Sequence, residues 1–214
     1  MQHGRLRQPR ESGGVLPAFS PAQTETLTYT DDMRIIALCG SLRLCSSNRA
    51  LLLAAQKLAP EGMDIAIFES IRDLPHFDPD LDGLDRDPED RPEGVLRLRR
   101  ELAASDAMLI STPEYAHGLP GALKNALDWL VSCTAMIGKP VALIYGSAGD
   151  ANHAQEQLME ILTTMCAVLV RDAIVAVQGA RSKVDDTGTV SDSQLVMQIN
   201  SALRALEAFV RTKK

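Results

Sequence analysis

Apolar runs rich in β-branched residues alternate with helical patterns along most of this 214-residue chain. Runs suited to buried strands occupy residues 33–39, 63–68, 107–111, 140–146 and about 168–177. Between and after them, apolar residues recur at helical spacing over about 48–59, 93–105, 119–133, 151–166 and 192–211. Strands that alternate with helices predict βαβ units with right-handed crossovers. The chain should therefore form an α/β fold with a doubly wound parallel sheet of five strands.

The chain divides into a polar start and one folded region. Residues 1–31 are rich in Gly, Pro, Ser and Thr and lack periodicity, which predicts a flexible N-terminal extension. Residues 32–214 are predicted to be one domain, since this length suits a single core. The acidic, proline-rich stretch 69–92 is predicted to be a long loop, either solvated or in a subunit contact. Its aspartates lack the spacing of an EF-hand loop, so no metal site is predicted there.

Composition narrows the class of partner. The formal net charge of −6 argues against nucleic-acid binding by the surface as a whole. No apolar run approaches the roughly 18–20 residues that span a bilayer, so no membrane partner is expected. The four cysteines form no C-x-x-C pair and show no metal-ligand spacing. Reduced thiols in a cytoplasmic protein are the plain interpretation.

The loop after the first predicted strand carries an unusual set of hydrogen-bond donors. Leu38-Cys-Gly-Ser-Leu-Arg-Leu-Cys-Ser-Ser-Asn48 joins that strand to a helix. Backbone N–H groups at a helix N-terminus are unpaired, and the helix dipole favours a negative charge there. Side-chain donors are added by Ser41, Arg43, Ser46, Ser47 and Asn48. The loop predicts a site for one phosphate group, although simple capping of the helix by Ser46 or Ser47 is the alternative.

Other phosphate-binding motifs fit this loop less well. A Walker A loop needs a second glycine and a lysine, which are missing. A dinucleotide fingerprint needs three glycines at this turn, and only Gly40 is present. Hydroxyl and amide side chains around a single phosphate suit a mononucleotide such as FMN.

Two further loops are predicted at the same edge of the sheet. Residues 112–121 follow the third strand, and residues 144–149, with two glycines, follow the fourth. Ligands of open α/β sheets bind outside the carboxyl ends of the strands, at the switch point between strands 1 and 3. The second loop could line a flat ring, and the small residues of the third let a ligand approach the backbone. Each loop alone is also explained as an ordinary βα connection.

Three segments together resemble the NADPH-dependent FMN reductase family. They are Gly40-Ser-Leu-Arg-x-x-Ser-x-Asn48, Thr112-Pro-Glu-Tyr115 and Gly121-x-Leu-Lys-Asn-x-Leu-Asp-Trp129. The resemblance covers about residues 33–211, and the family includes quinone, azo-dye and chromate reductases. It implies a flavodoxin-like, doubly wound five-stranded parallel sheet of order 2-1-3-4-5 with helices on both faces. It also implies FMN as the cofactor and NADPH or NADH as the electron donor.

The resemblance further implies which residues contact FMN. The phosphate ligands of the family correspond to Ser41, Arg43, Ser46 and Asn48, with Ser47 predicted beside them. The segment that lines the flavin corresponds to Pro113, Glu114 and Tyr115, and the loop at its pyrimidine edge to Gly146, Ser147 and Gly149. The family usually has asparagine after the tyrosine, where this chain has Ala116. A contact through that side chain is lost, whereas backbone contacts at Ala116 should survive.

Under this hypothesis the flavin carries the chemistry and no side chain is catalytic. Hydride would move from NAD(P)H to the flavin N5, and a small acceptor such as a quinone would take two electrons from the same face. Glu114 is predicted to be structural rather than a general base. His117 is interpreted as an exposed loop residue and Cys45 as an inert small one, although a nicotinamide contact and a redox role are their respective alternatives.

Two other functions stay open at this point. One is an FMN-binding electron carrier or redox sensor without NAD(P)H turnover. Short-chain flavodoxins of that kind typically have a T-x-T-G-x-T loop, from which Arg43 departs. The other is a flavin-free, phosphate-binding regulator. By family analogy we expect a homodimer or homotetramer that reduces small-molecule electron acceptors.

Overall fold

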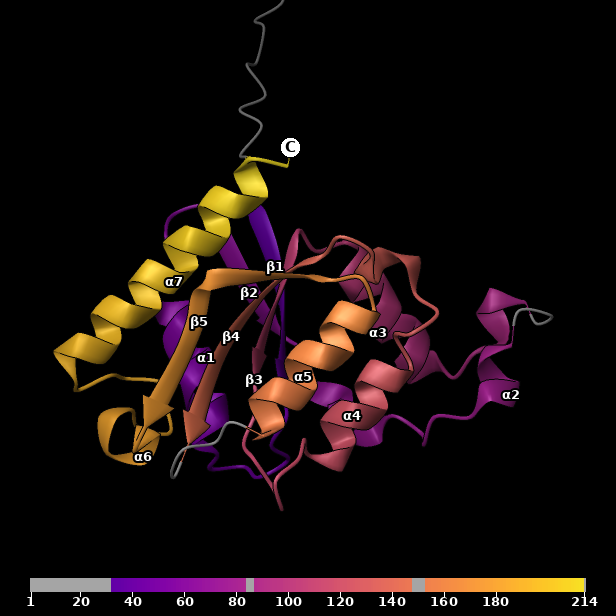
Figure 1. Cartoon of the computed structure of the whole chain (residues 1–214), viewed down its shortest axis with the longest axis horizontal. Helices are drawn as coiled ribbons and strands as arrows, with labels where there is room; N and C mark the ends of the chain where they lie inside the picture. The colour runs from indigo at the N-terminus through magenta and orange to yellow at the C-terminus, as the bar shows by residue number, and fades with distance from the viewer. Residues whose placement is uncertain (1–31, 84–86, 148–152, 214) are drawn as a thin grey trace, which may run out of the picture. The chain divides into compact units, whose positions relative to one another are not determined.

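Five parallel strands form one sheet at the centre of the fold (Figure 1). They are β1 (Met33–Cys39), β2 (Met63–Ile67), β3 (Ala107–Ser111), β4 (Pro140–Ser147) and β5 (Val168–Gln178). Their order across the sheet is β2-β1-β3-β4-β5, which confirms the predicted flavodoxin-like order. This computed structural model describes residues 32–83, 87–147 and 153–213. The predicted extension 1–31 lies outside the described residues.

Helices cover both faces of the sheet (Figure 1). One face packs against α1 (Ser47–Lys57) and α7 (Ser193–Arg211), the other against α3 (Glu93–Ala103), α4 (Gly121–Asp128) and α5 (His153–Thr164). Successive residues of β1 alternate between the two cores, so Ile35 faces α1 and α7 whereas Ile36 faces α3 and α4. Because both faces are buried, the strands are continuous apolar runs, as parallel sheets require.

Most helices and strands end within two residues of their predicted limits, and α4 is the exception. Its apolar stripe predicted a helix over residues 119–133, but the helix ends at Asp128. The guanidinium of Arg99 donates hydrogen bonds of 2.6 and 3.0 Å to the carbonyl oxygen of Trp129. This contact satisfies a carbonyl group that a longer helix would have used, and the chain turns away after it.

Residues 69–92, predicted to be a long loop that is solvated or in a subunit contact, are mostly exposed where the structure describes them but contain short helices. The described part includes η1 (Glu69–Asp73), α2 (Pro79–Asp82) and η2 (Pro88–Asp90). The indole N–H of the fully buried Trp129 donates to the carbonyl oxygen of Pro75 at 2.8 Å. The ring of Phe77 meets the Trp129 ring edge to face, with 5.1 Å between centroids. This stretch is therefore packed on the end of α4.

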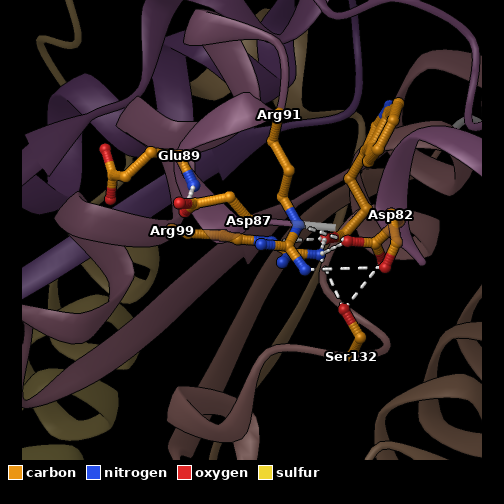
Figure 2. A network of polar contacts seen from close by, with 7 residues as sticks. Asp82, Asp87, Glu89, Arg91, Arg99 and Ser132 are labelled. Carbon is orange, nitrogen blue, oxygen red and sulfur yellow. Dashed lines mark hydrogen bonds and ion pairs between the residues drawn. The ribbon is translucent and has the colours of Figure 1, made fainter. Parts of the chain in front are cut away.

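A buried carboxylate, that of Asp82, connects residues 69–92 to the rest of the fold at a second point (Figure 2). Asp82 accepts hydrogen bonds from Arg91 at 2.6 Å, from Arg99 at 2.8 Å and from the Ser132 hydroxyl at 2.7 Å. Burial alone would raise the pKa of Asp82, but these hydrogen bonds and the charge of the arginines outweigh it and lower the pKa. The ionised Asp82 thus joins the end of α2 to α3 and to the turn after α4.

The described residues belong to one compact unit, Asp31–Lys214. None of the described helices is long and apolar enough to cross a membrane. The rest of the structure positions three loops at one edge of the sheet.

Candidate functional site

Three loops meet at the carboxyl edge of the sheet, where the arrowheads of β4 and β5 point in Figure 1. They follow β1, β3 and β4, which are neighbours in the sheet. The backbone N–H of Gly40 donates to the carbonyl oxygen of Ser111 at 2.8 Å and joins the first loop to the second. A Cβ on Gly40 would lie 2.3 Å from the hydroxyl oxygen of Thr112, so only glycine allows this approach. The structure brings the three predicted loops together.

The first loop presents donors at the start of α1. Ser41 and Ser47 are half-buried, whereas Arg43 is exposed and its side chain has no hydrogen bond or ion pair within the described part of the chain. The buried Ser46 is the N-cap of α1, since its Oγ accepts from the N–H of Arg49 at 3.5 Å. The capping interpretation is therefore confirmed for Ser46. A capping oxygen uses a lone pair, so the hydroxyl proton can still be donated to an anion.

Asn48 lies in the first turn of α1 and faces the protein interior, where it is 3% exposed. Its Oδ1 accepts a hydrogen bond from the Ser111 hydroxyl at 3.1 Å and another from the N–H of Gly146 at 2.9 Å. One side chain thus connects the start of α1 with the ends of β3 and β4. The sequence predicted Asn48 as a phosphate ligand and gave no sign of this contact, because its partners are distant in the chain.

The second loop is a tight hairpin turn. The backbones of Tyr115 and Gly118 exchange two hydrogen bonds of 3.0 Å. Between them, Ala116 and His117 have φ angles of 49° and 60°. Positive φ at both central positions is typical of a type I′ turn, and it is unfavourable for alanine because its Cβ crowds the backbone. The turn holds the exposed ring of Tyr115 at the edge of the sheet.

Glu114 connects the second loop to the helix that follows the third. Its Oε2 accepts a hydrogen bond from the N–H of Ala154, in the first turn of α5, at 2.9 Å. Its Oε1 lies 3.4 Å from Nδ1 of His117, whose ring meets the His153 ring edge to face. A carboxylate at a helix N-terminus satisfies an unpaired N–H and is favoured by the helix dipole. Pro113 and Glu114 are half-buried behind the turn.

The third loop is described only at its start. β4 ends at Ser147, which pairs with Gln178 of β5. Gly149 lies in residues 148–152, outside the described residues. A Cβ on Gly146 would lie 3.1 Å from that of Ala180, the first residue of the short helix α6 (Ala180–Lys183). Glycine at this position therefore also serves packing, which the sequence did not indicate.

Two titratable side chains near this edge are neutral at neutral pH. Burial raises the pKa of Tyr145, whose hydroxyl donates a hydrogen bond to Oε1 of Gln155. Burial is also the largest influence on Cys39 and raises the pKa of its thiol, although the contact with the carbonyl oxygen of Ser41 opposes it. Neither side chain therefore adds a negative charge at this edge.

The donors at this edge fit a phosphate group joined to a flat ring. Hydroxyl groups and the guanidinium of Arg43 lie on the loop before α1 and in its first residues, and the Tyr115 turn and the end of β4 lie on the neighbouring strands. Backbone groups in a fixed turn can line a ring without any particular side chain. Within the described residues, no group of three or more His, Cys, Asp or Glu could hold a metal ion.

Residues 33–182 match the family model described as NADPH-dependent FMN reductase. The NAD(P)H-dependent FMN reductase of Pseudomonas aeruginosa is 33% identical over 186 residues, which cover 85% of this chain and 97% of that protein. A quinone reductase of Escherichia coli K12 is 31% identical over 190 residues, which cover 86% of this chain and 99% of that protein. A solved structure of FerB, a flavoenzyme NAD(P)H:(acceptor) oxidoreductase from Paracoccus denitrificans, matches this fold with a TM-score of 0.74 and 31% sequence identity. The match covers 84% of this chain and 98% of the FerB chain.

Proposed function

The chain belongs to the NADPH-dependent FMN reductase family, and we propose that it binds FMN at the carboxyl edge of its sheet and uses NAD(P)H to reduce quinones or similar small acceptors. The observation that carries this proposal is the meeting of three loops, joined by Asn48, on neighbouring strands. The names of the relatives support the type of reaction, since they are FMN, quinone and acceptor reductases.

The first loop is proposed to hold the phosphate of FMN. The hydroxyls of Ser41, Ser46 and Ser47 and the guanidinium of Arg43 supply donors beside the N-terminus of α1. A guanidinium can give two parallel hydrogen bonds to phosphate oxygens, which is stronger than a neutral contact. The Oδ1 of Asn48 is used inside the protein, so this residue would contribute through its amide NH₂ group.

The second and third loops are proposed to hold the flavin ring. The backbone from Pro113 to Ala116 would line it, and the start of the third loop, with Ser147 and Gly149, would meet its polar edge. The N–H of Gly146 already donates to Asn48, so Gly146 would contribute by its lack of a side chain. The contact of Glu114 with Ala154 joins the second loop to the first turn of α5.

Bound FMN would supply the redox chemistry, by accepting hydride from NAD(P)H and returning two electrons to the acceptor. The chain would bind the cofactor, leave one ring face open and exclude side reactions. No general base is assigned. Glu114 lies in the segment proposed to line the ring, but its carboxylate oxygens contact the N–H of Ala154 and the ring of His117. We also propose that the protein is a homodimer or homotetramer, that it works in the cytoplasm and that it binds no nucleic acid. The four free thiols are consistent with a reducing compartment.

The absorption spectrum of the purified protein tests this function directly. We expect flavin absorbance that is bleached by NADPH or NADH under anaerobic conditions, and steady-state NAD(P)H consumption with a panel of quinones. A protein that binds FMN but shows no NAD(P)H consumption with any acceptor would be an electron carrier or sensor. A colourless protein that takes up no added FMN would refute the proposal.

A further inference from the structure

A cleft of about 270 Å³ borders the first loop. β2 is next to β1 at the edge of the sheet away from β3 and β4, and the cleft lies between the first loop and the segment after β2. Ser41 and Arg43, which line it, are also proposed for the FMN phosphate. The other residues used below are Leu42, Leu44, Arg49, Glu69 and Arg72.

The cleft has an excess of positive charge. Arg49 on α1 pairs with Glu69 on η1 through Nη1 and Oε2 at 2.6 Å, and among the described lining residues Glu69 is the only one with a carboxylate. Arg72 donates a hydrogen bond of 2.6 Å to the carbonyl oxygen of Leu42, which is neutral and cancels no charge. Three arginines and one glutamate therefore line the cleft. The chain as a whole has a net charge of −6, so this local positive charge would attract anions to the cleft.

Apolar side chains border the same cleft. Leu44 is 84% exposed and Leu42 is 42% exposed, both on the first loop, and both line the cleft. Exposed leucines beside arginines suit a ligand with an apolar, flat part and a phosphate group. The adenosine half of a pyridine dinucleotide has this chemistry. The volume is close to the smallest small-molecule pockets, about 300 Å³, and so suits part of a ligand.

We propose that this cleft binds a phosphate group on the adenosine half of NAD(P)H, through Arg49 and Arg72. This inference rests on the proposed function. The phosphate can be the 2′-phosphate, which only NADPH carries, or the diphosphate, which both nucleotides carry. Arg43, on the first loop, lines this cleft and is also proposed to hold the FMN phosphate. Arg49 and Arg72 belong to the cleft alone, since neither is among the residues assigned to FMN.

Binding of adenosine phosphates to the FMN-loaded protein tests the inference without turnover. We suggest calorimetric titration with 2′,5′-ADP and with 5′-AMP for the wild type, Arg49→Gln and Arg72→Gln. Arg100→Gln is the matched control, because Arg100 pairs with Glu93 at the same 2.6 Å on an exposed face of α3. The ratio of FMN to protein and the urea midpoint are measured for each variant.

We expect Arg49→Gln and Arg72→Gln each to weaken 2′,5′-ADP binding about tenfold, the effect of one charged hydrogen bond, and Arg100→Gln to leave it unchanged. If only 2′,5′-ADP is weakened, the cleft binds the 2′-phosphate. If 5′-AMP is weakened equally, the cleft binds the phosphate that both nucleotides share.

The inference would be overturned if the wild type bound neither probe, or if both arginine variants bound the probes as tightly as the wild type. Loss of FMN from both arginine variants would also overturn it, because the cleft would then belong to the FMN phosphate. The proposed function is tested separately by NAD(P)H oxidation in the wild type. A wild type that oxidises NAD(P)H while the variants bind the probes unchanged would reject this inference alone.

Discussion

The side-chain carbonyl of Asn48 accepts a hydrogen bond of 2.9 Å from the backbone N–H of Gly146, 98 residues further along the chain. The contact joins the first turn of α1 to the end of β4. These are the places proposed to hold the phosphate and the ring of FMN. A buried donor that loses its partner costs free energy, so this contact keeps the two parts of the site at a fixed distance.

Replacing Asn48 by alanine should therefore affect both stability and cofactor binding. We expect Asn48→Ala to lower the free energy of unfolding by about 1–3 kcal/mol, because Gly146 and Ser111 lose their acceptor. FMN affinity should fall as well. Asn125→Ala is the matched control. Asn125 lies in α4, and its Oδ1 accepts a hydrogen bond of 2.7 Å from the backbone N–H of Phe77. Urea unfolding should show a similar loss for Asn125→Ala, whereas its FMN affinity should be unchanged.

Arg43→Ala should weaken FMN binding and leave stability unchanged, the reverse of what is expected for Asn125→Ala. The side chain has no partner within the described residues, so the urea midpoint should be unchanged. FMN binding should weaken about tenfold to a hundredfold, the range for hydrogen bonds to a charged group. Titration of the apoprotein with FMN, followed by flavin fluorescence, measures this. An affinity equal to that of the wild type would remove Arg43 from the phosphate site.

The backbone at Ala116 predicts a stabilising substitution. Its φ angle of 49° is strained for alanine, so Ala116→Gly should raise the free energy of unfolding by about 1 kcal/mol. Asparagine, which the family usually has at this position, also tolerates positive φ and should stabilise as well. Ala103→Gly, at the exposed end of α3, is the control and should lower stability. Thermal unfolding that shows the same sign for both glycine variants would contradict this explanation.

Asp82 predicts a dependence of stability on pH. Its pKa is lower in the folded protein than the unfolded value of about 3.9, so the ionised carboxylate stabilises the fold above about pH 4. This contribution is lost as pH falls through the folded pKa. At pH 7, Asp82→Asn should lower the free energy of unfolding by about 3 kcal/mol, because Arg91 and Arg99 lose the negative charge of their buried partner. Urea unfolding at pH 7 and pH 3 should show the difference from wild type shrink at the lower pH.

Glu114→Ala tests whether this carboxylate takes part in the chemistry. Both of its oxygens contact protein groups, so we expect lower stability through the lost bond to Ala154. The rate at which NADPH reduces bound FMN in a single turnover should stay within about tenfold of the wild type. Loss of a general acid or base costs about a hundredfold or more. A fall of that size with FMN still bound would show that Glu114 is catalytic.

The sequence by itself determined the elements of this fold. Apolar runs bounded by turn residues predicted all five strands within two residues of their limits, because strands buried on both faces contain little else. The placement of the three loops at one edge also followed from the sequence, since parallel strands share their carboxyl edge. The first loop suggested a mononucleotide such as FMN, and the resemblance to a known family supplied the strand order and agreed with that cofactor.

Only the tertiary structure decided which polar groups meet. Nothing near Asn48 in the sequence identifies Gly146 as its partner, and nothing near Asp82 identifies Arg99. The end of α4 was missed for the same reason, since it depends on the contact of Arg99 with the carbonyl oxygen of Trp129. Local sequence sets the period and propensity of a segment. The partners of its buried polar groups are set by packing between segments that are distant in the chain, and this packing placed the Arg49 and Arg72 cleft beside the first loop.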